Sequence, residues 1–114
     1  MAFPDIPVLA LPSEVTTDRI EEIEGDADCA IGEEGAFLVI DLARTTFICS
    51  SGLGMLVKVS KRLHERGGAV AIARAMPAIG RLLKMVGLDP VLPAFASVEA
   101  ASVFLAEGRE ARAP

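Results

Sequence analysis

Two serines and two glycines stand close together in the segment Phe47–Gly54, and they are the residues of this chain best suited to chemistry. The apolar periodicity that follows Gly52 predicts a helix, so the serines should lie at its amino-terminal end, where unpaired backbone N–H groups favour negative charge. A serine hydroxyl there can cap the helix, which stabilises it by about 1 kcal/mol. It can equally accept a phosphoryl group, which adds about 1.5 to 2 negative charges. Ser50 and Ser51 are candidates for both roles.

The paired glycines exceed what a helix cap requires. Gly52 and Gly54 fall in the first turns of the predicted helix, where each glycine costs about 1 kcal/mol relative to alanine. Close approach of another molecule would account for that cost. The turn is therefore a candidate contact surface.

Cys49 and Met55 flank this turn, and each allows two interpretations. Cys49 is either a small apolar side chain at the end of a strand or a thiolate that the helix end stabilises and that could sense oxidation. Met55 lies off the main apolar stripe of the helix. It is either peripheral core or an exposed, flexible contact for a partner.

No catalytic or metal-binding constellation accompanies the serines. His64 is the only histidine and lies 14 positions after Ser50, about 21 Å along a continuous helix, which excludes a Ser–His or Cys–His pair on that helix. One histidine and two cysteines, Cys29 and Cys49, make no recognised ligand spacing, so we expect no metal and no cofactor. We expect both cysteines to be free thiols and the chain not to be an enzyme.

Length and composition limit the remaining function classes. The chain has 114 residues, 52% of them hydrophobic and 24% charged, which predicts one domain with a packed core. Aromatic residues make up only 4% and the net charge is −5, which argues against nucleic-acid binding. No run approaches the roughly 20 apolar residues that span a bilayer, so we expect no membrane insertion. Residues 1–11 lack the pattern of a signal peptide, and we expect a cytoplasmic protein.

Charge is distributed unevenly along the chain. Residues 1–48 contain two basic and eleven acidic residues, a net charge of −9, whereas residues 49–114 contain nine basic and five acidic residues, a net charge of +4. This asymmetry fits two solvated helix faces of opposite sign. It also fits a basic surface beside the serines that steers an acidic partner.

Strand-like and helix-like segments alternate along the whole chain. Continuous apolar runs predict buried strands, and apolar residues at helical spacing predict amphipathic helices. This order predicts an α/β domain over residues 1–107, with a mixed, mostly parallel sheet of about four strands and about four helices, followed by a frayed tail over residues 108–114. The strands are expected at 7–11, 36–40, 69–73 and within 88–95, and the helices at 18–31, 52–66, 77–86 and 98–107.

Several of these segments carry a shared pattern. Two parts of this pattern are single residues: Gly68 precedes a strand, and Pro77 opens a helix. The other parts are the stretches Phe37-Leu38-Val39-Ile40-Asp41-Leu42, Phe47-Ile48-Cys49-Ser50-Ser51-Gly52-Leu53-Gly54-Met55-Leu56, and Arg81-Leu82-Leu83 with Gly87-Leu88. In order and spacing they resemble the STAS domains of anti-sigma-factor antagonists, from about Phe37 to Leu105.

The resemblance implies a βα superhelical fold and a function as the partner of an anti-sigma factor that is also a serine kinase. In that family the unmodified antagonist binds the anti-sigma factor, phosphorylation of the first serine of the motif blocks binding, and a serine phosphatase reverses the modification. By position that serine is Ser50, with Ser51 as the alternate. Whether such a chain acts alone or as a homodimer stays open.

The chain departs from the family pattern at three places. Cys49 replaces a common Asp, Thr16 takes the place of an acidic residue in the segment Ser13–Thr16, and the amino-terminal part looks shorter by one strand. The partner-binding residues expected from the motif and its surroundings are Thr16, Cys49, Ser51, Gly52, Leu53, Gly54, Met55 and Lys58.

Two other functions remain as alternatives. STAS-like domains also serve as constitutive assembly subunits, in stressosomes, in lipid-transport complexes and behind anion transporters, without phosphorylation of the serine. A sensor that binds a nucleotide or another small anion at the helix end is the weaker alternative, because no second phosphate-binding loop is visible.

Overall fold

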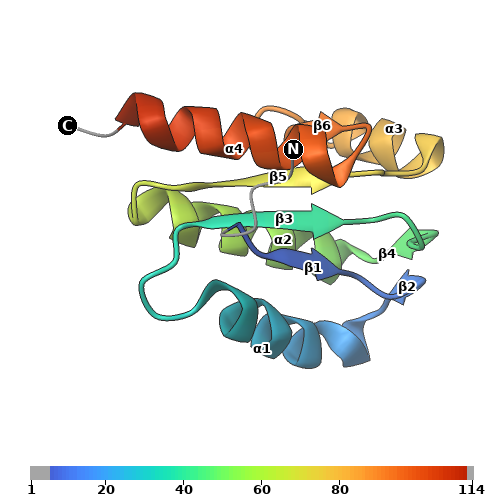
Figure 1. The fold of residues 1–114 in the computed structure, drawn as a ribbon. Helices are drawn as coiled ribbons and strands as arrows, with labels where there is room; N and C mark the ends of the chain where they lie inside the picture. Colours follow the sequence, from blue (N-terminus) through green and yellow to red (C-terminus); the bar gives the residue numbers. More distant parts are fainter. Residues whose placement is uncertain (1–5, 113–114) are drawn as a thin grey trace.

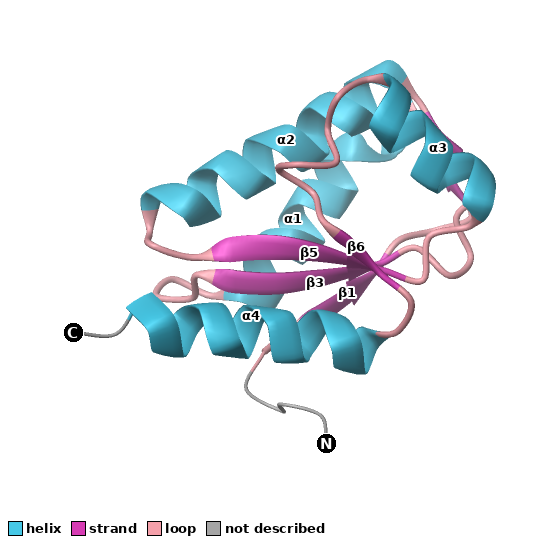
Figure 2. Cartoon of the chain, turned by 90° about the horizontal axis from the view of Figure 1, so that it is seen from above, coloured by secondary structure: helices cyan, strands magenta, loops and turns pink. Residues whose placement is uncertain are grey.

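A four-stranded parallel sheet lies between two layers of helices in the computed structural model, which describes residues 6–112 (Figure 1). Helix α4 covers one face of the sheet, and helices α1 and α2 cover the other (Figure 2). The prediction of an α/β fold with a mostly parallel sheet and four helices is confirmed. The strands lie in the order β1 (Val8–Ala10), β3 (Phe37–Asp41), β5 (Ala69–Ala73) and β6 (Ala94–Phe95), and the helices are α1 (Ile20–Ile31), α2 (Ser50–Glu65), α3 (Pro77–Met85) and α4 (Val98–Arg112).

The two central strands divide the core into two halves. Alternate residues of a strand point to opposite faces of the sheet, and β3 and β5 are apolar at almost every position because both faces are covered. Leu38 and Ile40 pack toward α1 and α2, whereas Val39 packs toward α4. On the α4 side β5 contributes only small side chains, and these let the helix approach closely: Ala69, Ala71 and Ala73 against Ala101, Leu105 and Ala106.

A second pair of strands lies outside the main sheet and was not predicted. β2 (Glu14–Val15) pairs in parallel with β4 (Phe47–Ile48), with Val15 opposite Ile48. Each strand has only two residues, too few to produce the alternating pattern by which a strand is predicted from sequence. In Figure 1 the pair lies beyond the carboxyl ends of the central strands.

The helix ends follow the predicted signals with two differences. Pro77 is the first residue of α3, and the Ser97 hydroxyl caps α4 by accepting a hydrogen bond of 3.0 Å from the backbone N–H of Ala100. Helix α2, however, begins at Ser50 rather than Gly52. Helix α4 continues to Arg112, through the stretch expected to be a frayed tail. One glycine costs a helix only about 1 kcal/mol, and its neighbours there are good helix formers; residues 113–114 lie outside the described part.

Two apolar side chains on or next to the helices are exposed, although their spacing matches the apolar stripes. Phe104 on α4 is 44% exposed and stacks beside Phe95 with ring centroids 4.9 Å apart. Val86 follows the end of α3 and is 48% exposed. Within residues 6–112, no helix combines the length and the apolar character that crossing a membrane requires.

A buried carboxylate ties the carboxyl ends of β3 and β5 together. Asp41 accepts two hydrogen bonds from the Arg74 guanidinium and one of 3.0 Å from the backbone N–H of Ala43. Burial by itself raises the pKa of Asp41, but the Arg74 hydrogen bonds, the Ala43 N–H and the charge of Arg74 outweigh it and hold that pKa below its ordinary value. Arg74 adopts a left-handed backbone with φ of 58°, which the paired carboxylate helps to hold.

Candidate functional site

The amino-terminal end of α2 meets the segment that follows β2. The parallel pairing of β2 and β4 aligns Val15 with Ile48, and the backbone N–H of Cys49 donates to the Val15 carbonyl at 2.9 Å. The residues next along each strand, Thr16 and Cys49, are thereby brought side by side. A short 3-10 helix, η1 (Thr17–Arg19), then leads into α1.

The two serines have different environments. Ser50 is the first residue of α2, its side chain is exposed, and its hydroxyl makes no hydrogen bond with any residue that the structure describes. The Ser51 hydroxyl lies 3.0 Å from the Thr17 hydroxyl and 3.1 Å from the Cys49 sulfur. Neither serine caps the helix, because Cys49 occupies the cap position. Ser50 is therefore the hydroxyl that an incoming molecule can reach without breaking an existing contact.

Cys49 lies half-buried among hydrogen-bond donors. The Ser51 hydroxyl is the main cause that lowers the pKa of the Cys49 thiol; burial opposes it, and the Gly52 and Ser51 N–H groups and the Thr17 hydroxyl lower it further. These donors stabilise the thiolate, as the end of a helix commonly does. Cys49 thus joins the polar cluster at the helix end rather than being a purely apolar side chain. Both cysteines are free within the structure.

The two glycines of the turn differ in what surrounds them. A Cβ atom at Gly52 would lie 2.8 Å from Ile48 Cγ2 and 2.8 Å from Val15 Cγ1, so packing of α2 against the β2–β4 pair requires glycine there. A Cβ at Gly54 would meet nothing within 4 Å, and the residue is exposed. No contact inside the described chain explains glycine at position 54.

Three residues expected near the contact surface have other roles. Met55 is only 4% exposed, so the expectation of an exposed contact is wrong and Met55 belongs to the core. The buried face of α2 is wider than one stripe because the helix packs on both the sheet and α1. Leu53 is half-buried against that core, and the Lys58 ammonium lies 3.1 Å from the Glu24 carboxylate.

Thr17 and Asp18 also lie at the site, although no pattern in the sequence indicated them. Thr17 contacts Cys49 and Ser51 across 32 and 34 residues of sequence, a proximity that only the β2–β4 pairing creates. The Thr16 hydroxyl donates to the Asp18 carboxylate, and this bond is the main cause that lowers the pKa of Asp18. A carboxylate therefore stands one residue after Thr17, although Cys49 replaces the common acidic residue.

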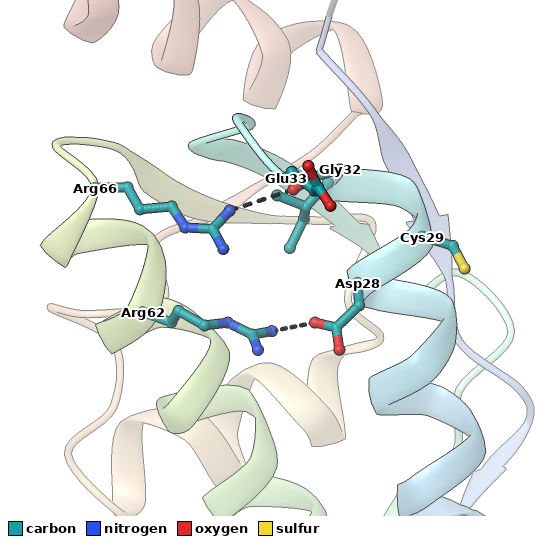
Figure 3. A pocket seen from close by; sticks show the side chains of 7 residues that line it. Asp28, Cys29, Gly32, Glu33, Arg62 and Arg66 are labelled. Carbon is teal, nitrogen blue, oxygen red and sulfur yellow. Dashed lines mark hydrogen bonds and ion pairs between the residues drawn. The ribbon is translucent and has the colours of Figure 1, made fainter.

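A hollow of about 330 Å³ lies between α1 and α2, and two arginines line it, as they would line a site for an anion (Figure 3). The Arg62 guanidinium pairs with Asp28, and Arg66 Nη1 donates to the Gly32 and Gly35 carbonyls at 3.3 and 2.8 Å. Together with the Lys58–Glu24 ion pair, these contacts form a ladder between the two helices. Its cations are Lys58, Arg62 and Arg66, on or just after α2, and each faces an acceptor on or just after α1. Both guanidinium groups at the hollow are thus already engaged with acceptors of this chain, and most of the basic face of α2 contacts α1 or the segment that follows it.

No group of three or more potential metal ligands occurs among residues 6–112. The polar cluster at the start of α2 contains hydroxyls, one thiol and one nearby carboxylate, without a histidine. This arrangement can present a hydroxyl for modification and a surface for contact.

Comparison with protein families and sequences gives the following matches. The family model described as the STAS domain matches residues 2–101. An anti-sigma F factor antagonist of Paenibacillus polymyxa is 34% identical over 58 residues, which make up 51% of this chain and 50% of that protein, so the match spans only half the length of that relative. A Bordetella bronchiseptica protein, BtrV, assigned as an anti-sigma factor antagonist, is 24% identical over 83% of this chain and 82% of its own length.

Solved structures share the fold at low sequence identity. A STAS domain protein from Planctomyces limnophilus superposes with a TM-score of 0.77 at 22% identity, covering 92% of this chain and 93% of that one. The phosphorylated form of Bacillus SpoIIAA gives 0.66 at 22% identity, covering 88% and 91%. The STAS domain of a SulP transporter from Vibrio cholerae gives 0.71 at 21% identity, covering 97% and 88%.

Proposed function

Because this chain belongs to the STAS domain family, we propose that it is an anti-sigma-factor antagonist: a non-enzymatic binding protein of the cytoplasm that docks on an anti-sigma factor through the start of α2. The observation that carries this proposal is the exposed Ser50 hydroxyl, which is without a hydrogen-bond partner among residues 6–112. Two relatives that bear the name of anti-sigma factor antagonists support the role. The partner proposed is an anti-sigma factor with serine-kinase activity, and a serine phosphatase restores the unmodified state.

The proposed control acts through charge. Phosphorylation of Ser50 would place a dianion at the amino-terminal end of α2, where the helix dipole stabilises it. The same dianion would have to be desolvated, or would meet like charge, when the partner covers this end of the helix. Binding would therefore be lost while the folded domain stays intact.

Ser50 is the preferred acceptor and Ser51 the alternate. Phosphorylation of Ser51 would break its hydroxyl contacts with Thr17 and Cys49, whereas Ser50 has no such contact within the described residues. The contact surface proposed around Ser50 comprises Thr16, Thr17, Cys49, Ser51 and Gly54, with half-buried Leu53 and ion-paired Lys58 at its margin. Gly52 is buried and supports this surface from beneath.

Binding of Ser50 variants to the serine-kinase anti-sigma factors encoded in the same genome tests this proposal. Ser50→Ala should bind as the wild type does, and Ser50→Asp should bind at least about tenfold more weakly, a loss of about 1.4 kcal/mol. Val91→Asp is the control, because it adds the same charge at an exposed position that lies outside the proposed contact surface. Equal affinity of Ser50→Ala and Ser50→Asp, measured by titration calorimetry, would contradict the switch.

A constitutive assembly role without phosphorylation is the second candidate, and Cys49 at the position of a common acidic residue is the observation that favours it. Intact-mass spectrometry of the chain purified from its host separates the two. A peptide carrying phosphate on Ser50 supports the switch, and a chain that stays unmodified under all growth conditions supports the assembly role.

A further inference from the structure

Exposed apolar side chains gather around β4 and α3. Seven large apolar residues within residues 6–112 are at least 36% exposed, and four of them lie on β4 or at the two ends of α3. Met85 is 83% exposed, which is far more than a core-facing helix position permits. Exposed apolar residues that cluster, rather than being scattered singly, mark sites of contact with other proteins. The four residues are Phe47, Met76, Met85 and Val86.

A groove runs between β4 and α3 at this place. It has a volume of about 420 Å³, and buried Ile48 and Ile79 are among its lining residues. Phe47 lines it from β4, and Leu82 and Met85 line it from α3. An apolar groove of this kind accepts apolar side chains from one face of a helix.

Arg81 is the single charged residue that lines the groove. It makes no hydrogen bond or ion pair with the part of the chain that the structure describes, unlike Arg62 on α2 and Arg74 at the end of β5. Helix α3 also carries Lys84 and contains no acidic residue. A cation without an internal partner beside an apolar groove is complementary to a carboxylate flanked by apolar side chains.

Ile48 links the groove to the start of α2. Ile48 lines the groove, and its Cγ2 atom occupies the space beside Gly52 where a Cβ would lie at 2.8 Å. Only Cys49 separates Ile48 from Ser50 in sequence. A partner that fills the groove therefore also approaches the start of α2, which would make its affinity sensitive to charge on Ser50.

We propose that the β4–α3 groove binds an amphipathic helix of the anti-sigma factor, which inserts two apolar side chains one turn apart beside Phe47 and Met85 and pairs a carboxylate with Arg81. This inference rests on the proposed function and extends it. The groove would supply the contacts that hold the anti-sigma factor, and phosphorylation of Ser50 would control whether that protein binds. The nine residues of α3 are about 13 Å long, enough to face two turns of a partner helix.

Charge-changing variants of the groove test the inference with the same anti-sigma factor. Met85→Asp and Arg81→Glu should each weaken binding of the Ser50→Ala chain at least tenfold. Val91→Asp and Lys61→Glu are matched controls, since Val91 is an exposed apolar residue and Lys61 an exposed cation, and neither lines the groove. Both controls should change the affinity less than twofold. Circular dichroism checks that all four variants remain folded, which the exposure of Met85 and Arg81 leads us to expect.

A charge swap identifies the acidic contact on the partner. Reversal of the contacting carboxylate to lysine should restore binding to Arg81→Glu and weaken binding to the chain with Arg81. Methyl NMR of methionine-labelled protein adds a direct readout, because Met85 lines the groove and Met55 is buried. The Met85 methyl signal should shift on binding more than the Met55 signal.

The outcomes separate this inference from the proposed function. If Ser50→Asp abolishes binding but Met85→Asp and Arg81→Glu bind like the controls, the function stands and the groove assignment is wrong. If the groove variants instead abolish self-association in sedimentation experiments and leave the anti-sigma factor bound, the occupant is a second copy and the assignment is again wrong. If no anti-sigma factor of the genome binds the wild-type chain, both proposals fail.

Discussion

At the scale of single residues, Gly52 and Gly54 lie two positions apart on one helix, but only Gly52 is packed against other parts of the chain. Alanine at Gly52 would bring its Cβ within 2.8 Å of Ile48 and Val15, and we expect Gly52→Ala to lower the free energy of unfolding by about 1 to 3 kcal/mol. Gly54→Ala meets no atom and should raise it by up to about 1 kcal/mol through helix propensity.

Denaturant unfolding of both variants measures these changes, and binding of the anti-sigma factor then tests why position 54 is glycine. A more stable Gly54→Ala chain that binds more weakly would indicate close approach by the partner. A chain that gains stability and binds normally would show that Gly54 has no role in contact.

The reactivity of Cys49 is a second residue-scale prediction. Because the Ser51 hydroxyl is the main cause that lowers the pKa of the Cys49 thiol, Ser51→Ala should move the pH midpoint of Cys49 alkylation upward. Peptide mass spectrometry after timed iodoacetamide labelling measures the midpoint. Cys29, exposed on α1, is the internal control, and its labelling should be the same in both chains. An unchanged Cys49 profile would contradict this account.

At the scale of elements, the ladder between α1 and α2 combines two kinds of contact. Arg62 pairs with an exposed carboxylate, so Arg62→Gln should lower the free energy of unfolding by less than about 1 kcal/mol, and about 1 M salt should remove most of that effect. Arg66 donates to the neutral carbonyls of Gly32 and Gly35 instead. Arg66→Gln should therefore cost about 1 kcal/mol with little dependence on salt.

Unfolding of the two variants at low and high salt distinguishes these contacts, with Lys61→Gln as the control for loss of an exposed cation from α2. Equal salt dependence of Arg62→Gln and Arg66→Gln would contradict the assignment of Arg66 to the carbonyls that follow α1.

At the scale of the whole molecule, Asp41 links the stability of the sheet to pH. Its pKa in the folded chain lies below the ordinary value of 3.8, so its ionised form stabilises the fold above pH 3.8. That contribution is lost as the pH falls below 3.8 through the lower folded pKa. Asp41→Asn should cost about 2 kcal/mol near neutral pH and make unfolding less sensitive to acid.

Urea unfolding of the wild type and Asp41→Asn from about pH 3 to pH 7 follows this linkage. Asp89→Asn, an exposed carboxylate, is the control and should leave the pH dependence of the wild type in place. Parallel pH profiles of Asp41→Asn and the wild type would exclude Asp41 as a source of the acid sensitivity.

Local patterns in the sequence were enough to predict the four main strands, the four helices and the turn that contains Ser50. Such patterns record burial directly, because an element covered on both faces is apolar throughout and an amphipathic helix is apolar every three to four residues. The family resemblance added Ser50 as the candidate acceptor, which stays a prediction. The interpretation of Met55 as an exposed contact was wrong, because the spacing of apolar residues indicates one buried stripe, whereas α2 packs against both the sheet and α1.

The tertiary structure alone decided which serine hydroxyl lacks a hydrogen bond among residues 6–112, which cations are paired and which residues line the groove between β4 and α3. Strands of two residues carry no pattern, so the β2–β4 pair that brings Thr17 to Ser51 had no signal in the sequence. The ion pairs of α2 and the groove beside Arg81 likewise join residues about 30 positions apart. Contacts at such separations depend on how the elements pack, and a single sequence read locally contains no record of that packing.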